Sequence, residues 1–365
     1  MILMNDFAAE PEALHAEELA AAGRVLRSSR FILGPEVQRF EESWARLCGT
    51  RFCVGVGNGM DAIELGLRAL NIGAGDEVIT TPMTAMATIM AIKRAGATPV
   101  LADIEPDTAL LDMASAQRCL TRQTKAVLLV HLYGQLPDMD AWLEFCEQSK
   151  IHLLEDAAQA HGAIRGGRPA GSFGEWAAFS FYPTKNLGAK GDAGALVTNS
   201  EDVTNRVRML RNYGAATRYE HLESGMNSRL DELQAAILLA RLNWLDRFNR
   251  IRRTTAARYF AALTNPHIAL LSPPAEAESH VYHLFVVRCL ERDRLAEHLK
   301  TNGIESLIHY PIPAHRQPCF KDMRVDSGGL PNAERHAAQC LSLPCHPHLR
   351  DEDVSTIIKD ANAFA

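Results

Sequence analysis

The hydrophobic pattern between residues 50 and 200 alternates short apolar runs with segments of helical periodicity. The runs have the length of buried strands and are rich in β-branched residues. They lie at residues 52–56, 77–80, 98–101, 126–132, 151–155, 177–181 and 195–198. A helical segment such as 60–70 places Ile63, Leu67 and Leu70 on one face. Strands that alternate with helices predict an α/β fold with a mostly parallel, mixed sheet covered by helices.

The pattern changes after residue 200. Two long helices are predicted, at 201–212 and 230–259, before Pro266, Pro273 and Pro274 interrupt the periodicity. Further on, the pattern predicts two strands and one helix, at 282–288, 304–308 and 292–300 respectively. Since 365 residues exceed one ordinary core, we expect a large domain over 1–245 and a smaller α+β domain over 246–365. The helix near 230–260 would bridge them.

Composition and charge exclude several classes of protein. Hydrophobic residues make up 47% of the chain and charged residues 22%, as in globular proteins, and the net charge is −6. The densest basic stretch, 247–253, lies in a helical pattern and is interpreted as a solvated helix face, so no nucleic-acid partner is expected. No signal peptide and no apolar stretch of membrane-spanning length are found.

The eight cysteines form neither a C-x-x-C pair nor a regular spacing. This pattern favours thiols in a reducing cytosol over a disulfide framework or a zinc site. We therefore expect a cytoplasmic protein that has no metal site and no membrane partner.

The residues that can carry chemistry gather around Lys185, which lies in the run Ser180-Phe-Tyr-Pro-Thr-Lys-Asn-Leu-Gly188. Asp156 directly follows the strand predicted at 151–155, and Gln159 comes three residues later. In parallel sheets, ligands collect at the carboxyl ends of strands. These residues are the parts needed to hold pyridoxal phosphate, because a Lys amine forms its Schiff base and an Asp keeps its pyridine nitrogen protonated.

A glycine-rich turn, Val54-Gly-Val-Gly-Asn-Gly-Met60, joins a predicted strand to a predicted helix and could bind a phosphate group. Its third glycine comes one position too early for a dinucleotide fingerprint. Taken singly, each residue also has a structural interpretation. The turn could simply be tight, Ser180 could cap a strand end, and Asp156 could cap a helix.

Taken together, five motifs resemble those of the DegT/DnrJ/EryC1/StrS family of pyridoxal-phosphate-dependent sugar aminotransferases, which have the type I aspartate-aminotransferase fold. The resemblance extends from about residue 31 to residue 347. The motifs are Gly57-Asn-Gly-Met-Asp-Ala62, Glu155-Asp-Ala-Ala-Gln-Ala-His-Gly162, Ser180-Phe-Tyr-Pro-Thr-Lys-Asn-Leu-Gly188, Gly191-Asp-Ala-Gly194 and Gly225-Met-Asn-Ser-Arg-Leu-Asp-Glu-Leu-Gln-Ala-Ala236.

The resemblance implies a role for each matching residue. Lys185 would form the Schiff base, Asp156 would pair with the pyridine nitrogen, and Gln159 would lie against the cofactor ring. The phosphate would be held by Ser180 and by the backbone of Gly59 and Met60. Asn227 would reach the phosphate of a neighbouring subunit, so the active sites would be shared in a homodimer. Pyridoxamine phosphate would form between the two half-reactions.

Two positions depart from the family pattern. Met60 stands where the family commonly has Thr or Ser, which removes one hydroxyl contact to the phosphate. Ala85, in Thr84-Ala-Met-Ala-Thr88, stands where the family usually has an aromatic ring stacked on the cofactor. Met86 or another side chain would then cover the ring.

The acceptor substrate is indicated by the loop at 308–318, which proline residues stiffen and which displays His309, Tyr310 and His315. A rigid connector is the structural interpretation of this loop. The loop resembles that of aminotransferases acting on nucleotide-linked 3-keto-6-deoxyhexoses. The resemblance thus implies amination at C-3 of a dTDP-linked keto sugar, with glutamate as donor.

Three other functions remain open at this point. The first is amination at C-4 or of a UDP-linked keto sugar. The second is a sugar dehydratase, which Lys185 argues against because such relatives have His at that position. The third is a regulatory protein that binds pyridoxal phosphate without turnover.

Overall fold

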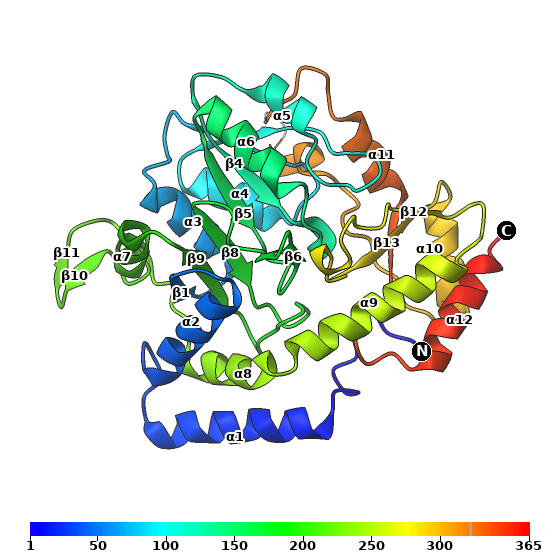
Figure 1. Cartoon of the computed structure of the whole chain (residues 1–365), viewed down its shortest axis with the longest axis horizontal. Coiled ribbons are helices and arrows are strands. Elements are labelled where there is room, and N and C mark those ends of the chain that lie inside the picture. The colour runs from blue at the N-terminus through cyan, green and yellow to red at the C-terminus, as the bar shows by residue number, and fades with distance from the viewer. Residues whose placement is uncertain (321–322) are drawn as a thin grey trace.

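The computed structural model describes residues 1–320 and 323–365 and is built around one large sheet (Figure 1). The sheet has eight strands in the order β1-β9-β8-β5-β4-β2-β3-β14. Their bounds are β1 (Phe52–Val56), β2 (Glu77–Thr80), β3 (Thr98–Leu101), β4 (Thr124–Val130), β5 (His152–Asp156), β8 (Trp176–Ser180), β9 (Gly194–Thr198) and β14 (Arg324–Val325). Neighbouring strands from β8 to β14 are parallel, while β9 runs antiparallel to β1 and β8. The predicted mostly parallel, mixed sheet is confirmed.

The register of the central strands brings their carboxyl ends to one edge. Asp156 pairs with Val130 of β4 and with Ala178 of β8, and Ser180 pairs with Gly194 of β9. The last residues of β5 and β8 therefore lie at the same edge of the sheet, where the chain places its candidate chemistry.

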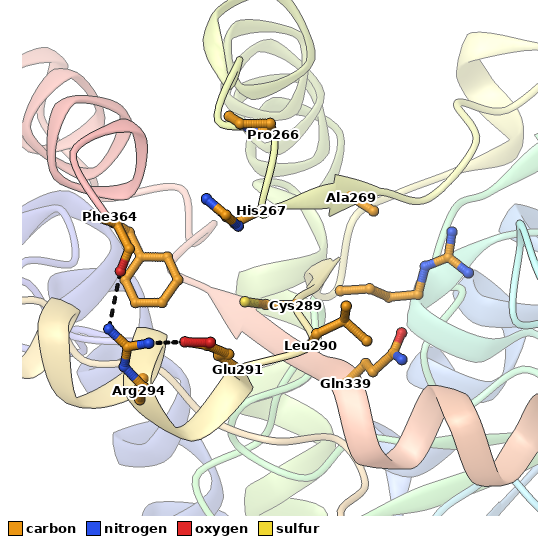
Figure 2. A pocket seen from close by; sticks show the side chains of 11 residues that line it. Pro266, His267, Ala269, Cys289, Leu290, Glu291, Arg294, Gln339 and Phe364 are labelled. Atoms are coloured by element: carbon orange, nitrogen blue, oxygen red, sulfur yellow. Dashed lines mark hydrogen bonds and ion pairs between the residues drawn. The ribbon is translucent and has the colours of Figure 1, made fainter.

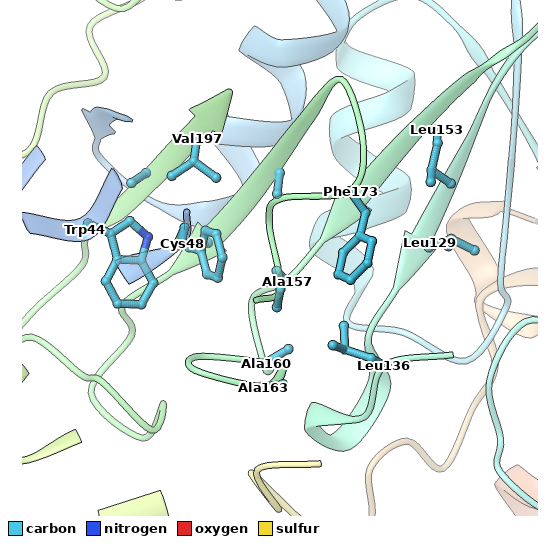
Figure 3. Packing of buried hydrophobic residues seen from close by; sticks show 14 of the residues in the cluster. Trp44, Cys48, Leu129, Leu136, Leu153, Ala157, Ala160, Ala163, Phe173 and Val197 are labelled. Carbon is cyan, nitrogen blue, oxygen red and sulfur yellow. The ribbon is translucent and has the colours of Figure 1, made fainter. Parts of the chain in front are cut away.

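Side chains on the two faces of the sheet belong to two separate hydrophobic clusters. Along β8 they alternate, so that Ala177 and Phe179 join one cluster while Trp176 and Ala178 join the other. Helices α2 (Pro35–Leu47), α6 (Met139–Ser149) and α8 (Glu232–Leu242) contribute to the first cluster, and α3 (Gly59–Ala69), α4 (Met86–Arg94) and α7 (Glu201–Leu210) contribute to the second. Figure 3 shows part of the first cluster, including Trp44 and Phe173. Each large side chain buried in this way contributes roughly 1.5–3 kcal/mol to folding.

The helix predicted at 230–259 is wrong as a single helix. The chain forms α8 and then α9 (Leu245–Ala262), with a break at Asn243 and Trp244. The Trp244 indole N–H donates to Glu17 on α1 (Glu12–Ser28), which packs along α8. In Figure 1, α8 lies beneath the large sheet and α9 leads away from it to the small sheet, so the break redirects the chain.

The small sheet is antiparallel and consists of β12 (Ala269–Leu270), β13 (Phe285–Arg288) and β15 (Cys340–Leu343). Side chains from α9, α10 (Arg292–Thr301) and α12 (Asp351–Asn362) form its hydrophobic cluster. The strand predicted at 304–308 is wrong, because Ile304 bridges Ile2 while Leu307 bridges Ser342, so no continuous ladder forms. The predicted boundary between domains at 245 and 246 stays a prediction.

The remaining elements connect or decorate these two sheets. They are α5 (Met113–Cys119), α11 (Pro331–Gln339), the two-residue strands β6 (Ile164–Arg165) and β7 (Arg168–Pro169), and the hairpin of β10 (Ala215–Thr217) and β11 (Glu220–His221). The hairpin projects from the body of the molecule (Figure 1). Among the described residues, no helix has the length and apolar character needed to cross a membrane.

The short strand β14 brings the C-terminal part of the chain back to the large sheet. It pairs with β3, and the following residue, Asp326, donates its N–H to the Leu101 carbonyl over 2.8 Å. The Asp326 carboxylate accepts hydrogen bonds from Ser115 and Arg118 on α5. A polar anchor thus fixes this return to the edge of the sheet.

Candidate active site

Lys185 lies in a tight turn immediately after β8. Its N–H donates to the Tyr182 carbonyl over 2.8 Å, and the Ala189 N–H returns to the Phe181 carbonyl over 2.8 Å. Desolvation lowers the pKa of the Lys185 amine to about 8, while the charge of Asp156 acts in the opposite direction. A large fraction of the amine is therefore neutral, and hence nucleophilic, slightly above neutral pH.

The Asp156 carboxylate is buried at the end of β5 and held by hydrogen bonds. Burial raises its pKa, whereas hydrogen bonds from Thr88 and Ala158 and the charge of Lys185 act to lower it. Thr88 Oγ1 lies 2.7 Å from Asp156 Oδ2, and Thr84 Oγ1 lies 2.7 Å from Thr88 Oγ1. Because an ionised carboxylate only accepts, Thr88 donates to Asp156 and Thr84 donates to Thr88. The two hydroxyls fix the direction of the carboxylate.

The N-terminus of α3 lies against the end of β8. A Cβ atom on Gly59 would come within 2.8 Å of the Ser180 Cβ, so only glycine fits there. The Asn58 side chain accepts from the Asp61 N–H over 2.9 Å and caps the helix. The N–H groups of Gly59 and Met60 belong to the first turn and have no acceptor within the helix. Together with the Ser180 hydroxyl, they form a cradle that fits a phosphate group.

Gln159 is buried close to Asp156 and uses both ends of its amide. Its Oε1 accepts from the Tyr133 N–H over 2.6 Å, and its Nε2 donates to the Tyr310 hydroxyl over 3.3 Å. Tyr310 therefore reaches from the loop at 308–318 to Gln159, near the carboxyl end of β5, and its role toward the substrate stays a prediction. Contact of Gln159 with a cofactor ring stays a prediction.

Three neutral histidines surround Lys185. Burial and the charge of Lys185 lower the pKa of His309 to about 4, that of His161 to about 3, and that of His283 well below its ordinary value. His309 Nδ1 lies 2.8 Å from the Ser342 hydroxyl, and His283 Nδ1 lies 3.2 Å from Asn186 Oδ1. Uncharged imidazoles add no positive charge next to the amine of Lys185.

His315 and Asn227 lie in other surroundings. His315 Nε2 is 3.0 Å from Glu334 Oε1 on α11, which also pairs with Arg316, so His315 faces that helix. Asn227 is exposed and bridges Asn212 near the projecting hairpin. A role for either residue toward the substrate or a neighbouring subunit stays a prediction.

The position without an aromatic ring, Ala85, precedes α4, and Met86 begins that helix. Met86 is half-buried and packs against the same hydrophobic cluster as Tyr310. A role for Met86 in covering the cofactor ring stays a prediction.

Residues 5–10, here called the N-terminal arm, lie beside the turn that contains Lys185. A cavity of about 20 Å³ there is lined by Asp6, Phe7, Lys185, Arg252 and His346, among others. Burial alone would raise the pKa of Glu10, but Arg241 and Lys190 outweigh it and lower the pKa to about 2. This ionised carboxylate fastens the arm beside the turn, because Arg241 Nη2 lies 2.6 Å from Glu10 Oε1.

A larger cavity, of about 440 Å³, lies at the small sheet, apart from these residues (Figure 2). It is lined by residues such as His267, Cys289 and Gln339. Arg294 there is held by Glu291 and by the backbone carbonyl of the last residue, Ala365. None of the predicted site residues lines this cavity.

Several residues of the site escaped prediction from sequence. Thr84 and Thr88 bracket the matched stretch at 84–88, yet only the three-dimensional structure shows them beside Asp156. His161 and Tyr133 look like core residues in sequence, and both are buried. The spacing between Thr88 and Asp156 is 68 residues, so no local pattern could have joined them.

The model of the DegT/DnrJ/EryC1/StrS aminotransferase family matches residues 12–361. The chain belongs to this family. It is 46% identical over 361 residues to a dTDP-3-amino-3,4,6-trideoxy-alpha-D-glucose transaminase of Streptomyces venezuelae, covering 99% of this chain and 95% of the relative. It is also 41% identical to a pleiotropic regulatory protein of Geobacillus stearothermophilus, covering 99% and 98%.

Solved structures of similar sequence have the same fold. The structure of S. venezuelae DesV in complex with a ketimine intermediate is 46% identical and has a TM-score of 0.95, covering 100% of this chain and 97% of that one. NtdA from Bacillus subtilis, with bound cofactor PMP, is 29% identical with a TM-score of 0.90, covering 98% and 83%. The predicted family and fold class are confirmed.

Proposed function

We propose that this aminotransferase uses pyridoxal phosphate to transfer an amino group from glutamate to C-3 of a dTDP-linked 3-keto-6-deoxyhexose, in deoxyamino-sugar biosynthesis. The observation that carries the proposal is that the chain brings Lys185, whose amine has its pKa lowered to about 8, within electrostatic reach of the buried carboxylate of Asp156 at the end of β5. The relative with 46% identity, which is named for a 3-amino sugar, supports the ring position.

The residues of the site fit pyridoxal phosphate and each has a defined task. When bound, the cofactor supplies a reactive aldehyde carbon and a ring that accepts electrons. The cradle of Gly59, Met60 and Ser180 holds the phosphate, and Asp156 keeps a proton on the ring nitrogen. Lys185 would bind the aldehyde carbon of the cofactor, and its amine could also carry a proton as a general base and acid.

Two side chains of the loop at 308–318, His309 and Tyr310, are uncharged. His309 is neutral, and burial followed by the charge of Asp156 raises the pKa of Tyr310 to about 12, so that its hydroxyl stays protonated. Neutral donors and acceptors suit the hydroxyl and keto oxygens of the sugar ring.

A homodimer with shared sites is part of the proposal. The projecting hairpin and the segment beside it expose large apolar and aromatic side chains at Tyr213, Tyr219 and Leu222, close to Asn227. Such a patch is typical of a surface that contacts another chain. A cytoplasmic location agrees with eight cysteines that are all free, seven of them buried.

A panel of nucleotide sugars tests the proposed function. Purified protein loaded with pyridoxal phosphate is mixed with glutamate, and the conversion to pyridoxamine phosphate is followed by absorbance. Keto sugars linked to dTDP or UDP, with the keto group at C-3 or C-4, are then added and the products identified by mass and NMR. Amination of the dTDP-linked 3-keto sugar alone, or at the highest kcat/KM, is the expected result.

Two alternative functions would give different results in the same assay. Faster amination of a C-4 keto sugar or a UDP-linked sugar would change the assigned substrate, while the protein would remain an aminotransferase. The Geobacillus relative is named as a regulatory protein. A regulatory protein without turnover would show no absorbance change with glutamate. The intact pair of Lys185 and Asp156 favours the enzyme.

A further inference from the structure

Tyr133 occupies the point where three segments distant in sequence meet. Its side chain is 2% exposed, and its backbone lies in the left-handed region, with a φ of 62°, which few residues with a Cβ atom adopt. The next residue must be glycine, because a Cβ atom at Gly134 would lie 2.7 Å from the Gln159 carbonyl oxygen. Such strain persists only where the surrounding structure enforces it.

The hydroxyl of Tyr133 has both of its hydrogen-bonding roles in use. It lies 2.6 Å from the His309 carbonyl oxygen and 2.9 Å from His336 Nε2. A carbonyl only accepts, so the single hydroxyl proton goes to His309, and His336 must donate through Nε2–H. Burial, followed by the charge of Arg288, lowers the pKa of His336 to about 4, which agrees with a neutral ring.

The backbone of Tyr133 fixes the orientation of Gln159. An N–H group only donates, so the atom of Gln159 that lies 2.6 Å from the Tyr133 nitrogen must be the amide oxygen. The amide nitrogen then faces the Tyr310 hydroxyl, at 3.3 Å, and donates to its oxygen. Tyr133 therefore contacts the loop at His309 directly and at Tyr310 through Gln159.

This polarity leaves the hydroxyl proton of Tyr310 available. In the described part of the chain, no acceptor lies within hydrogen-bond distance of that proton. The Tyr310 side chain is only partly buried and feels the charge of Asp156, which places its hydroxyl on the side of the cofactor site.

We propose that Tyr133 is a positioning residue, which holds Gln159 and the backbone of His309 so that Tyr310 presents its hydroxyl as a hydrogen-bond donor to an oxygen atom beside Lys185. The proposal rests on the proposed function, because that oxygen belongs either to the keto sugar or to the cofactor ring. Tyr133 itself touches neither. It acts on the site through the two residues that it fixes.

The variant Tyr133→Phe tests this role because it keeps the ring and removes only the hydroxyl. The His309 carbonyl and His336 then lose their partner, and the loop is free to move away from Gln159. We expect a change in one of two quantities. Either the KM for the keto sugar changes by about tenfold, or the midpoint of the pH titration of the visible absorbance of the bound cofactor moves by about one pH unit. A change in KM assigns the acceptor oxygen to the sugar, and a change in the absorbance midpoint assigns it to the cofactor.

Tyr259→Phe is the matched control. Tyr259 is fully buried among the residues of the small sheet, and its hydroxyl donates to the Pro344 carbonyl over 2.6 Å, as that of Tyr133 does to His309. Its loss should lower the melting temperature without changing KM or the absorbance midpoint. If Tyr133→Phe lowers the melting temperature in the same way and leaves both quantities unchanged, the positioning role is refuted.

A double variant links the effect to Tyr310. Tyr310→Phe should reproduce the change seen with Tyr133→Phe, and combining the two should add little, because Tyr310→Phe removes the donor that Tyr133→Phe displaces. Fully additive effects would overturn the proposal. A failure of the proposed function is distinguishable, since the wild-type protein would then not aminate any keto sugar, while the absorbance midpoint and the melting temperatures would still report on Tyr133.

Discussion

The floor of the candidate site and the loop that faces it are built in different ways. The floor comes from residues at the ends of neighbouring strands and helices, such as Asp156, Ser180 and Gly59, where the sheet register fixes each position. The loop at 308–318 forms no continuous strand pairing. The positions of its histidine and tyrosine side chains are therefore set by the individual residues that each one contacts. His309 turns to Ser342, whereas His315 turns to Glu334.

This difference teaches which parts of a site a fold determines in advance. At a strand end, the side chain that follows the strand can point only one way relative to its neighbours. In a loop, two residues six positions apart can serve unrelated partners. Substitutions in the floor should therefore lower turnover with every substrate. Substitutions in the loop should have effects that differ between residues of the same type, according to the partner that each residue contacts.

The largest effect is expected for Lys185→Ala, at the centre of the floor. Removing the amine removes both the covalent attachment and the proton carrier, so turnover should fall by about 10⁴-fold or more. The visible absorbance of bound pyridoxal phosphate should change to that of the free aldehyde. Undiminished transamination by this variant would show that the floor has been misassigned.

Asp156→Asn should lower turnover by roughly 10²–10⁴-fold, because the ring nitrogen would no longer be held protonated. It should also change the titration of Lys185. Asp156 favours the charged amine, so its removal should lower the pKa of Lys185 below about 8. The rate at which apoprotein reacts with pyridoxal phosphate, measured against pH, should then reach its midpoint at a lower pH than in wild type. A midpoint that stays or rises contradicts the pairing.

Thr88→Val should have a smaller effect in the same region. The hydrogen bond from Thr88 lowers the pKa of Asp156, so its loss should raise that pKa further and bring protonation of the carboxylate to higher pH. A lost hydrogen bond to a charged group corresponds to about a tenfold fall in kcat. The acid limb of the pH–rate profile should move to higher pH. Thr198→Val, which removes a buried hydroxyl that donates to the Glu175 carbonyl over 2.6 Å, is the control and should leave the profile in place.

The smallest effects are expected for the two histidines of the loop, and they should be unequal. His309→Gln removes a neutral ring next to Lys185 and should raise KM for the keto sugar by a few-fold, about the value of one hydrogen bond. His315→Gln removes a partner of Glu334, which keeps Arg316, and should leave kinetics close to wild type. Equal effects of both variants would show that the loop is not organised by its contacts.

Sequence predicted the floor well because its signals are local. The strand runs between residues 50 and 200 coincide closely with the observed strands, and Asp156, Ser180 and Lys185 follow directly from them. The helix predicted at 230–259 was wrong because the helical pattern continues through Asn243 and Trp244, while the contact of Trp244 with α1 depends on the tertiary structure. The segment at 304–308 has strand-like residues, but its two partners, Ile2 and Ser342, lie in different parts of the chain.

The contacts that sequence could not supply are those between distant residues. Thr88 approaches Asp156 only because α4 and β5 meet at the edge of the sheet. Tyr133 approaches His309 and His336 across 176 and 203 residues. Thr88, Asp156, Tyr133 and His336 are buried and carry polar groups, which need hydrogen-bond partners that the sequence does not identify.

The return of β14 to the large sheet has a consequence for biosynthesis. During translation, β3 emerges more than 200 residues before Arg324 pairs with Val100. Until then, the nascent sheet presents a bare edge of unpaired N–H and carbonyl groups, which is a template for joining another unfinished chain. Ribosome-bound chains that stop before Arg324 should therefore depend on chaperones.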